Sequence, residues 1–176
     1  MSRTSGKISA QVITGYCIVF VMLLSDQLSK FLIMRLVPHE NSVPVVSNVF
    51  HITLIYNTGA AFGILKGHPV FFTAVSVLAV IIINYFILFK QRVLTGGEKA
   101  ALYMILAGTS GNLIDRLRFG YVVDFFDFRI WPVFNMADSF ITIGAFLLGW
   151  SLFYGNSARR AAPGSKEVKE AADKNA

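Results

Sequence analysis

Charged residues are scarce in this chain, and their scarcity argues against a soluble globular domain. Asp, Glu, Lys and Arg make up 15% of the 176 residues, whereas soluble domains carry roughly 25%. Hydrophobic residues reach 55%, and the mean hydropathy is +0.59. A surface with so little charge must face an apolar medium, so we expect a single domain embedded in a lipid bilayer.

Residues that bind metal ions are also few. The single cysteine, Cys17, excludes an intramolecular disulfide and a CxxC metal site. His39, His51 and His68 lie far apart, without the HxxH or HxxxH spacing of a zinc site. We therefore expect neither a metal nor any other cofactor.

The net charge of +6 does not indicate nucleic-acid binding, because the basic residues lie at the ends of apolar segments rather than beside aromatic residues in one stripe. If the N-terminus is cytoplasmic, ten basic residues lie on that side: Arg3, Lys7, Lys90, Arg92, Lys99, Arg159, Arg160, Lys166, Lys169 and Lys174. Six lie on the opposite side: Lys30, Arg35, Lys66, Arg116, Arg118 and Arg129. This bias predicts that both termini are cytoplasmic.

Four apolar segments are each close to the roughly 20 residues that a helix needs to cross about 30 Å of hydrocarbon. They cover about residues 12–34, 70–90, 99–118 and 136–155. The third is the least apolar, since Asn112, Asp115 and Arg116 lie near its end. The expected fold class is all-α, with four transmembrane helices in one domain over residues 1–155. Residues 156–176 are predicted to form a basic, disordered cytoplasmic tail.

The segments between the predicted helices have their own patterns. Residues 43–56 are rich in Val, Ile, Phe and Thr, and Pro44 and Gly59 bound them, which predicts strands. Residues 57–63 read Asn-Thr-Gly-Ala-Ala-Phe-Gly, a turn of small residues. The loop over residues 119–134 is strongly aromatic, so we expect it at the level of the lipid headgroups.

Two aspartates, Asp124 and Asp138, are the candidate catalytic residues. Both are flanked by apolar residues at the same predicted depth near the extracytoplasmic face, and a short loop joins them. Two neighbouring carboxyls cannot both ionise easily, so the pair supplies a base that activates water and an acid that protonates a departing amine. Asp138, in a first helical turn, is the expected anion, and Asp124 the expected acid. Taken singly, Asp138 could merely start a helix and Asp124 could be a solvated loop residue.

Polar residues of the third segment accompany this pair. Asn112 and Arg116 are four residues apart and share one helix face, where an amide and a cation can bind a peptide backbone. Arg118 is equally consistent with a contact to lipid headgroups. Asp115 has the spacing for an ion pair with Arg118.

Four further polar residues have a structural or a functional interpretation. Asp26 and Lys30 have the i,i+4 spacing and the order of a helical ion pair, so we assign them a supporting role. Asn57 is a turn former, and Asn135 precedes the fourth helix as an N-cap would. Either asparagine could instead bind a substrate backbone, and the sequence leaves both alternatives open.

Five motifs occur in the order typical of one family. They are Asp26-Gln27-Leu28-Ser29-Lys30, Asn57-Thr58-Gly59-Ala60-Ala61-Phe62-Gly63, Gly111-Asn112-Leu113-Ile114-Asp115-Arg116, Val122-Val123-Asp124-Phe125 and Phe134-Asn135-Met136-Ala137-Asp138-Ser139. Together they resemble the bacterial lipoprotein signal peptidase, also called signal peptidase II. The resemblance covers about residues 16–154.

The resemblance implies a fold, a location and an activity. It implies four transmembrane helices, an extracytoplasmic β-cradle and a short amphipathic segment, in the bacterial inner membrane. Asp124 and Asp138 correspond to the catalytic dyad of an aspartic endopeptidase that needs no metal. The other residues carried over are Asn57, Asn112, Arg116 and Asn135 near the dyad, with Asp26, Lys30 and Asp115 in support.

The resemblance also implies partners. The substrates are prolipoproteins that carry a diacylglyceryl group, cut just before the modified cysteine, and the inhibitors are globomycin-type cyclic peptides. Membrane lipid is a further partner, and one chain suffices for a complete site, so a monomer is expected. Two other classes remain open on the residues alone: a small proton-coupled transporter and a non-catalytic lipid-binding subunit.

Overall fold

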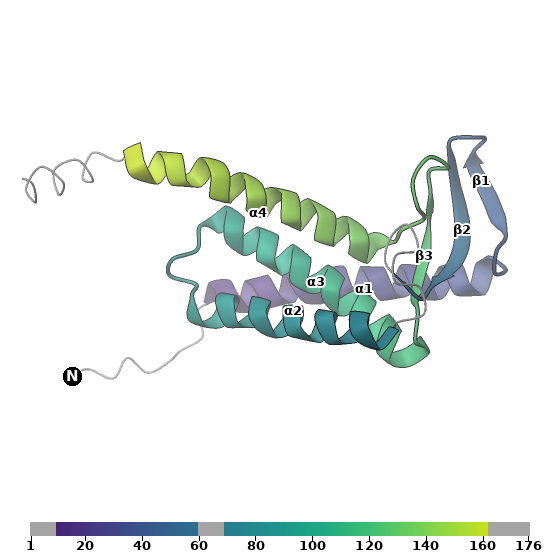
Figure 1. Cartoon of the computed structure of the whole chain (residues 1–176), viewed down its shortest axis with the longest axis horizontal. Coiled ribbons are helices and arrows are strands. Elements are labelled where there is room, and N and C mark those ends of the chain that lie inside the picture. The colour runs from purple at the N-terminus through teal and green to yellow at the C-terminus, as the bar shows by residue number, and fades with distance from the viewer. Residues whose placement is uncertain (1–9, 60–68, 162–176) are drawn as a thin grey trace, which may run out of the picture.

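The computed structural model describes residues 10–59 and 69–161, and for residues 155–161 it describes the backbone alone. Within these residues the chain forms four helices and three strands. They are α1 (Ala10–Leu36), β1 (Ser42–Val46), β2 (Phe50–Asn57), α2 (Pro69–Phe89), α3 (Gly96–Phe119), β3 (Val122–Asp127) and α4 (Met136–Ala161). The helices lie side by side as a bundle, and the sheet lies at one end of it (Figure 1).

Three of the helices, α1, α2 and α4, are long and apolar enough to cross a bilayer. The fourth, α3, has 24 residues, which at about 1.5 Å per residue is also sufficient length, but its sequence is more polar. It contacts all three other helices and carries more of the buried residues than any of them. A central helix needs less apolar surface, because its neighbours rather than lipid cover it.

Two glycines let the other helices approach α3 closely. A Cβ atom on Gly108 would collide with the backbone carbonyl of Ala137 in α4, and one on Gly111 would collide with the side chain of Asp26 in α1. Both positions therefore require glycine for a packing reason. Their effect is to bring the start of α4 and the polar part of α1 against one stretch of α3.

The helix ends follow from local capping. Thr95 and Glu98 form a capping box at the start of α3, and Gly120, with φ +79°, ends it in the left-handed conformation. α4 continues to Ala161, whereas the sequence predicted its end near residue 155. The first residues of the segment 156–176, predicted as a disordered tail, are therefore helical, and residues 162–176 lie outside the described part of the chain.

The sheet is antiparallel with the order β1-β2-β3. The strands predicted over residues 43–56 are confirmed as the β1–β2 hairpin. The aromatic loop over residues 119–134 contains a strand that the sequence analysis missed, β3, which pairs with β2 so that Asn57 faces Val122 and Ile55 faces Asp124. The sequence of β3 shows no clear alternation of apolar and polar residues, and its extended conformation depends on pairing with a distant strand.

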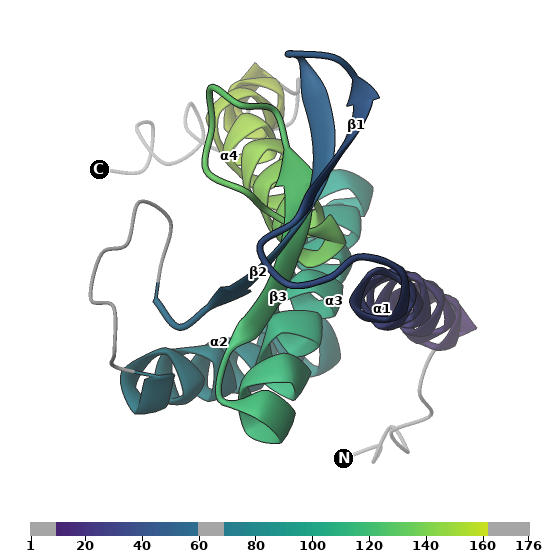
Figure 2. The same cartoon turned by 90° about the vertical axis from the view of Figure 1, so that its right-hand side faces the viewer.

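Two predicted features, a turn and an amphipathic segment, are not tested by the described part of the chain. Of the turn predicted over residues 57–63, only residues 57–59 belong to the described chain. The amphipathic segment that the resemblance implies does not occur as a separate element within residues 10–59 and 69–161, so it stays a prediction. Seen along the bundle, β3 runs across the ends of α3 and α4 (Figure 2).

Candidate active site

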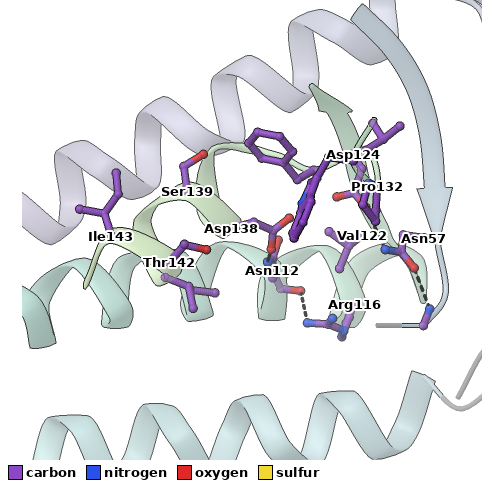
Figure 3. A pocket seen from close by; sticks show the side chains of 15 residues that line it. Asn57, Asn112, Arg116, Val122, Asp124, Pro132, Asp138, Ser139, Thr142 and Ile143 are labelled. Carbon is purple, nitrogen blue, oxygen red and sulfur yellow. Dashed lines mark hydrogen bonds between the residues drawn. The ribbon is translucent and has the colours of Figure 1, made fainter. Parts of the chain in front are cut away.

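A cavity of about 570 Å³ lies where the sheet meets α3 and α4. Residues from five parts of the chain line it, and Figure 3 shows most of their side chains converging on one space. They are Asn57 and Gly59 at the end of β2 and just beyond it, Asn112 and Arg116 of α3, Val122 and Asp124 of β3, residues 131–134 of the following loop, and Asp138, Ser139, Ile141, Thr142 and Ile143 of α4. Both candidate catalytic aspartates therefore face the same cavity.

Asp124 is held in the sheet and is almost fully buried, with 2% of its surface exposed. Its Oδ2 accepts a hydrogen bond from Asn57 Nδ2 at 2.9 Å, and its Oδ1 accepts one from Asn135 Nδ2 at 2.6 Å. Burial, and secondly the negative charge of Asp138, raise the pKa of Asp124 to about 7. The carboxyl therefore keeps its proton at a pH where an exposed aspartate has lost it.

Asp138 is held by the start of α4. The Asn135 backbone N–H donates to Asp138 Oδ2 at 3.2 Å, and the Asp138 backbone N–H donates to Asn135 Oδ1 at 2.9 Å. This reciprocal pair is a capping box, so the predicted N-cap role of Asn135 is confirmed. Asn112 Nδ2 donates to Asp138 Oδ1 at 2.8 Å, and part of the carboxyl remains open to the cavity.

Asn135 and Asn112 connect the two aspartates. Asn135 binds both, through its side-chain amide to Asp124 and through its backbone to Asp138. Asn112 Oδ1 accepts from Lys30 Nζ at 3.0 Å and from Asn135 Nδ2 at 3.2 Å. Because its oxygen receives these two donors, its nitrogen must point at Asp138, and the amide orientation is determined.

An ionic cluster of Asp26, Lys30 and Asp115 lies beside the site and is fully buried. Lys30 Nζ lies 3.0 Å from Asp26 Oδ2 and 2.9 Å from Asp115 Oδ2. The predicted pairing of Asp26 with Lys30 is therefore present. The predicted pairing of Asp115 with Arg118 is wrong, because α1 packs against α3 and brings Lys30 to Asp115, while the Arg118 side chain is exposed.

The cluster also binds backbone groups of the site. Asp115 Oδ2 accepts from the Val123 N–H at 3.2 Å, and Asp26 Oδ1 accepts from the Ala137 N–H at 2.9 Å. These two residues precede Asp124 and Asp138 directly, so the cluster holds the backbone on which both aspartates stand. The sequence analysis missed Gln27, whose Nε2 donates to Asp26, Asp115 and the Gly111 carbonyl. The available signal was its place beside Asp26 in the motif Asp26-Gln27-Leu28-Ser29-Lys30.

Arg116 and Arg118 have different environments, as the sequence analysis expected. Arg116 is half-buried, its guanidinium lies 5.7 Å from the centre of the Phe72 ring, and its Nη1 is 3.4 Å from both Ser76 Oγ and the Asn112 carbonyl oxygen. Arg116 lines the cavity, whereas Arg118 is exposed and lies over the ring of Phe119. Ser76 and Phe72 are contacts across two helices that no sequence spacing indicates.

Asn57 makes the turn-forming contact that the sequence predicted and also lines the cavity, while its binding to a substrate backbone stays a prediction. Its Oδ1 accepts from the Gly59 backbone N–H at 2.9 Å, which is the turn-forming contact. Its Nδ2 donates to Asp124, and its side chain lines the cavity (Figure 3). The structure thus brings together every predicted site residue, with Asp26, Lys30 and Asp115 one layer behind the cavity.

The charge distribution of this site suits proton transfer. Among the described residues no lysine, arginine or histidine forms an ion pair with Asp124 or Asp138; amide groups surround them instead. A protonated acid beside a second carboxyl can provide a proton donor and a proton acceptor in one cavity. Such an arrangement can support hydrolysis by an activated water.

Comparison with known proteins gives a consistent family. The family model described as signal peptidase (SPase) II matches residues 18–154. Lipoprotein signal peptidase of Halothermothrix orenii is 45% identical over 134 residues, which cover 76% of this chain and 90% of that protein. Lipoprotein signal peptidase of Clostridioides difficile is 38% identical over 148 residues, covering 82% and 99%.

The fold has a solved counterpart. A structure described as a bacterial membrane enzyme at 2.3 Å resolution matches with a TM-score of 0.77 at 33% identity, covering 84% of this chain and 92% of that one. The family model spans the three membrane-capable helices in large part, both aspartates and every other site residue described above. The chain therefore belongs to the signal peptidase II family.

Proposed function

We propose that this protein is an aspartic endopeptidase that removes signal peptides from diacylglyceryl-modified prolipoproteins, with Asp124 and Asp138 as its catalytic residues. The observation that carries the proposal is the raised pKa of Asp124, about 7, in a cavity that a second carboxyl shares. Family membership supplies the peptidase activity and the lipoprotein substrate class. The chemistry of the site supports the aspartic mechanism.

Asp138 acts as the base in this mechanism. Two N–H donors, from Asn112 and Asn135, and the N-terminal end of the α4 dipole stabilise a negative charge on its carboxylate. It takes a proton from a water molecule, and the resulting hydroxide attacks the carbonyl carbon of the scissile peptide bond. No covalent enzyme intermediate forms.

Asp124 acts as the acid. Its proton, retained because of burial and the nearby charge, is donated to the nitrogen of the departing amine as the C–N bond breaks. The products are a new carboxyl group on the signal peptide and a free amine on the modified cysteine. The proton that Asp138 took from water then passes to Asp124, which restores the starting state of the pair.

Four polar residues position the substrate in this proposal: Asn57, Asn112, Arg116 and Asn135. A peptide must unwind before it is cut, and the released backbone groups need partners that lipid does not provide. The cavity continues along α4 past Ser139 and Thr142 to Ile143 (Figure 3), so one of its walls is helical, with Ile141 and Ile143 as its apolar part. Such a wall suits the apolar part of a signal peptide, or the lipid on the cysteine.

The membrane arrangement follows the same proposal. All four helices span the bacterial inner membrane, including α3, and the sheet and the cavity lie at the extracytoplasmic face. The start of α1 and the end of α4 both lie at the end of the bundle away from the sheet, which supports two cytoplasmic termini (Figure 1). One chain holds the whole site, so we propose a monomer that needs no metal and binds globomycin-type inhibitors in the cavity.

A cleavage assay with two matched substrates tests this function. Purified protein is incubated with one prolipoprotein that carries the diacylglyceryl group and with the same prolipoprotein lacking it. We expect cleavage before the cysteine in the first case and little or none in the second. Equal cleavage of both substrates would refute the lipid requirement, and no cleavage of either would refute the peptidase.

A further inference from the structure

A second polar cluster lies on the sheet, away from the aspartate pair. Asp127, at the end of β3, is 6% exposed and accepts three hydrogen bonds. Thr53 Oγ1 donates to its Oδ2 at 2.7 Å, the Arg129 backbone N–H donates to its Oδ1 at 2.9 Å, and Arg129 Nη1 lies 3.0 Å from its Oδ2. These contacts lower the pKa of Asp127, so the residue is a carboxylate. Thr53, Asp127 and Arg129 are called the turn cluster below.

The turn cluster stabilises a strained turn. Arg129 has φ +67°, in the left-handed region that is unfavourable for a residue with a side chain. The Ile130 N–H donates to the Phe128 carbonyl at 2.8 Å, which tightens the same turn. Asp127 binds both the backbone and the side chain of Arg129, and these bonds offset the cost of the conformation.

The chain that follows this turn forms a wall of the cavity. Residues 131–134 line it, and Phe134 then pairs with Phe126 through backbone hydrogen bonds of 2.7 and 3.1 Å. The wall is therefore attached at two points: by the turn cluster at one end and by the Phe126–Phe134 pairing at the other. Between them, Ile130 is 93% exposed, and Trp131 lines the cavity with 60% of its surface exposed.

We propose that Asp127 is a positioning residue that holds this wall in place and so determines how tightly the cavity binds its substrate. The inference rests on the proposed function, because it takes the cavity as the substrate site. Asp127 is three residues from Asp124 in β3 and therefore projects from the opposite face of the strand. It acts on affinity through the loop and leaves the proton of the aspartate pair unchanged.

The main test is Asp127→Asn, which keeps the size of the side chain and removes its charge. A neutral amide holds the arginine less well than a carboxylate does. We expect KM for the diacylglyceryl prolipoprotein to rise about tenfold, which corresponds to about 1.4 kcal/mol, with kcat and its pH profile within about twofold of the unmodified protein. Glu40→Gln removes a 78%-exposed acid from the same side of the molecule and is the matched control. Its KM should not change.

A second pair of variants separates positioning from folding. Thr53→Val removes the hydroxyl that binds Asp127, while Thr53→Ser retains it, so the first should raise KM and the second should restore it. The chain has two tryptophans, Trp131 and Trp150. In a Trp150→Phe background the fluorescence anisotropy of Trp131 should fall in Asp127→Asn and Thr53→Val as the wall loosens.

The outcomes are distinguishable from a failure of the proposed function. An unchanged KM in Asp127→Asn and Thr53→Val overturns the inference, and so does a loss that appears only in kcat or in the yield of folded protein. A failure of the proposed function appears instead as retained cleavage in Asp124→Asn, whatever the turn cluster does.

Discussion

Two groups of aspartates occupy the same end of the bundle, and their surroundings differ in one respect. Asp26 and Asp115 share the ammonium group of Lys30 at 3.0 and 2.9 Å. Asp124 and Asp138 share no cation among the described residues and receive only N–H donors from asparagines. The first group is an ion cluster built around one cation, and the second, called the uncompensated pair, has no ion-pair partner among the described residues.

The difference shows that the position of one cation separates a structural role from a chemical one. Lys30 gives Asp26 and Asp115 a cationic partner, and these two side chains hold the backbone N–H groups of Ala137 and Val123 in place. A buried carboxyl without a cation retains its proton to a higher pH, as the pKa of about 7 for Asp124 shows. Asn112 links the two groups, since it accepts from Lys30 and donates to Asp138.

The largest expected effect comes from removing an acid of the uncompensated pair. Asp124→Asn or Asp138→Asn should lower kcat at least about 10³-fold, because each removes a group that transfers a proton. Folding should be retained, since asparagine keeps the size of the side chain and, through its one carbonyl oxygen, one of the two N–H contacts at either site. The rate of cleavage of diacylglyceryl prolipoprotein measures kcat, and thermal unfolding in detergent shows whether the variant is folded. Substantial cleavage by either variant would remove that residue from the dyad.

The complementary change is Lys30→Met, which leaves two buried carboxylates without their cation. Removing one partner of a buried ion pair costs about 3–5 kcal/mol, so we expect a large loss of stability, measured by thermal unfolding. In the triple variant Asp26→Asn, Lys30→Met, Asp115→Asn, no charge remains, and much of the stability should return. If Lys30→Met is as stable as the unmodified protein, the cluster does not have the structural role assigned to it.

The raised pKa of Asp124 predicts a pH dependence of stability. Its folded-state pKa of about 7 exceeds the ordinary 3.8, so the folded protein binds a proton between these values that the unfolded chain has lost. The stabilisation that Asp124 adds to the free energy of unfolding is therefore complete below about pH 4. It falls as the pH rises to about 7, and the free energy does not change further with this group above that pH. Unfolding temperatures of the unmodified protein and Asp124→Asn, compared from pH 4 to 8, should diverge by several degrees. Parallel curves would contradict the shift.

The same pKa predicts the alkaline side of the activity profile. Cleavage needs the proton on Asp124, so kcat should fall as the pH rises above about 7. Replacing Asp127, which is a carboxylate outside the cavity, should leave this limb in place. A rate that is constant from pH 6 to 9 would contradict the assignment of Asp124 as the acid.

The smallest expected effect on cleavage is the difference between replacing Arg116 and replacing Arg118. Arg116→Ala should lower kcat/KM about tenfold, because the half-buried guanidinium lines the cavity and contacts Phe72. Arg118→Ala should change it less than about twofold, because this exposed side chain lies over Phe119, outside the cavity. Equal effects in the same cleavage assay would remove the distinction between them.

Much of the fold could be predicted because hydropathy is a local property. The apolar segments, the β1–β2 hairpin and the capping role of Asn135 each depend on neighbouring residues alone. The strand β3 could not be predicted in the same way, because its regular conformation depends on pairing with β2, more than 60 residues earlier. The pairing of Asp115 was predicted incorrectly for a similar reason: a helical spacing indicated Arg118, whereas the real partner comes from another helix.

By itself, the sequence indicated a membrane protein and predicted that two acids, Asp124 and Asp138, lie close together, because composition and spacing suffice for both statements. Only the tertiary structure decided which aspartates obtain a cation and which do not. That outcome depends on how α1 packs against α3, because this packing brings Lys30 to Asp115, which is far from it in the sequence. Electrostatic compensation acts over a few ångströms of space, and spacing along the chain does not report it.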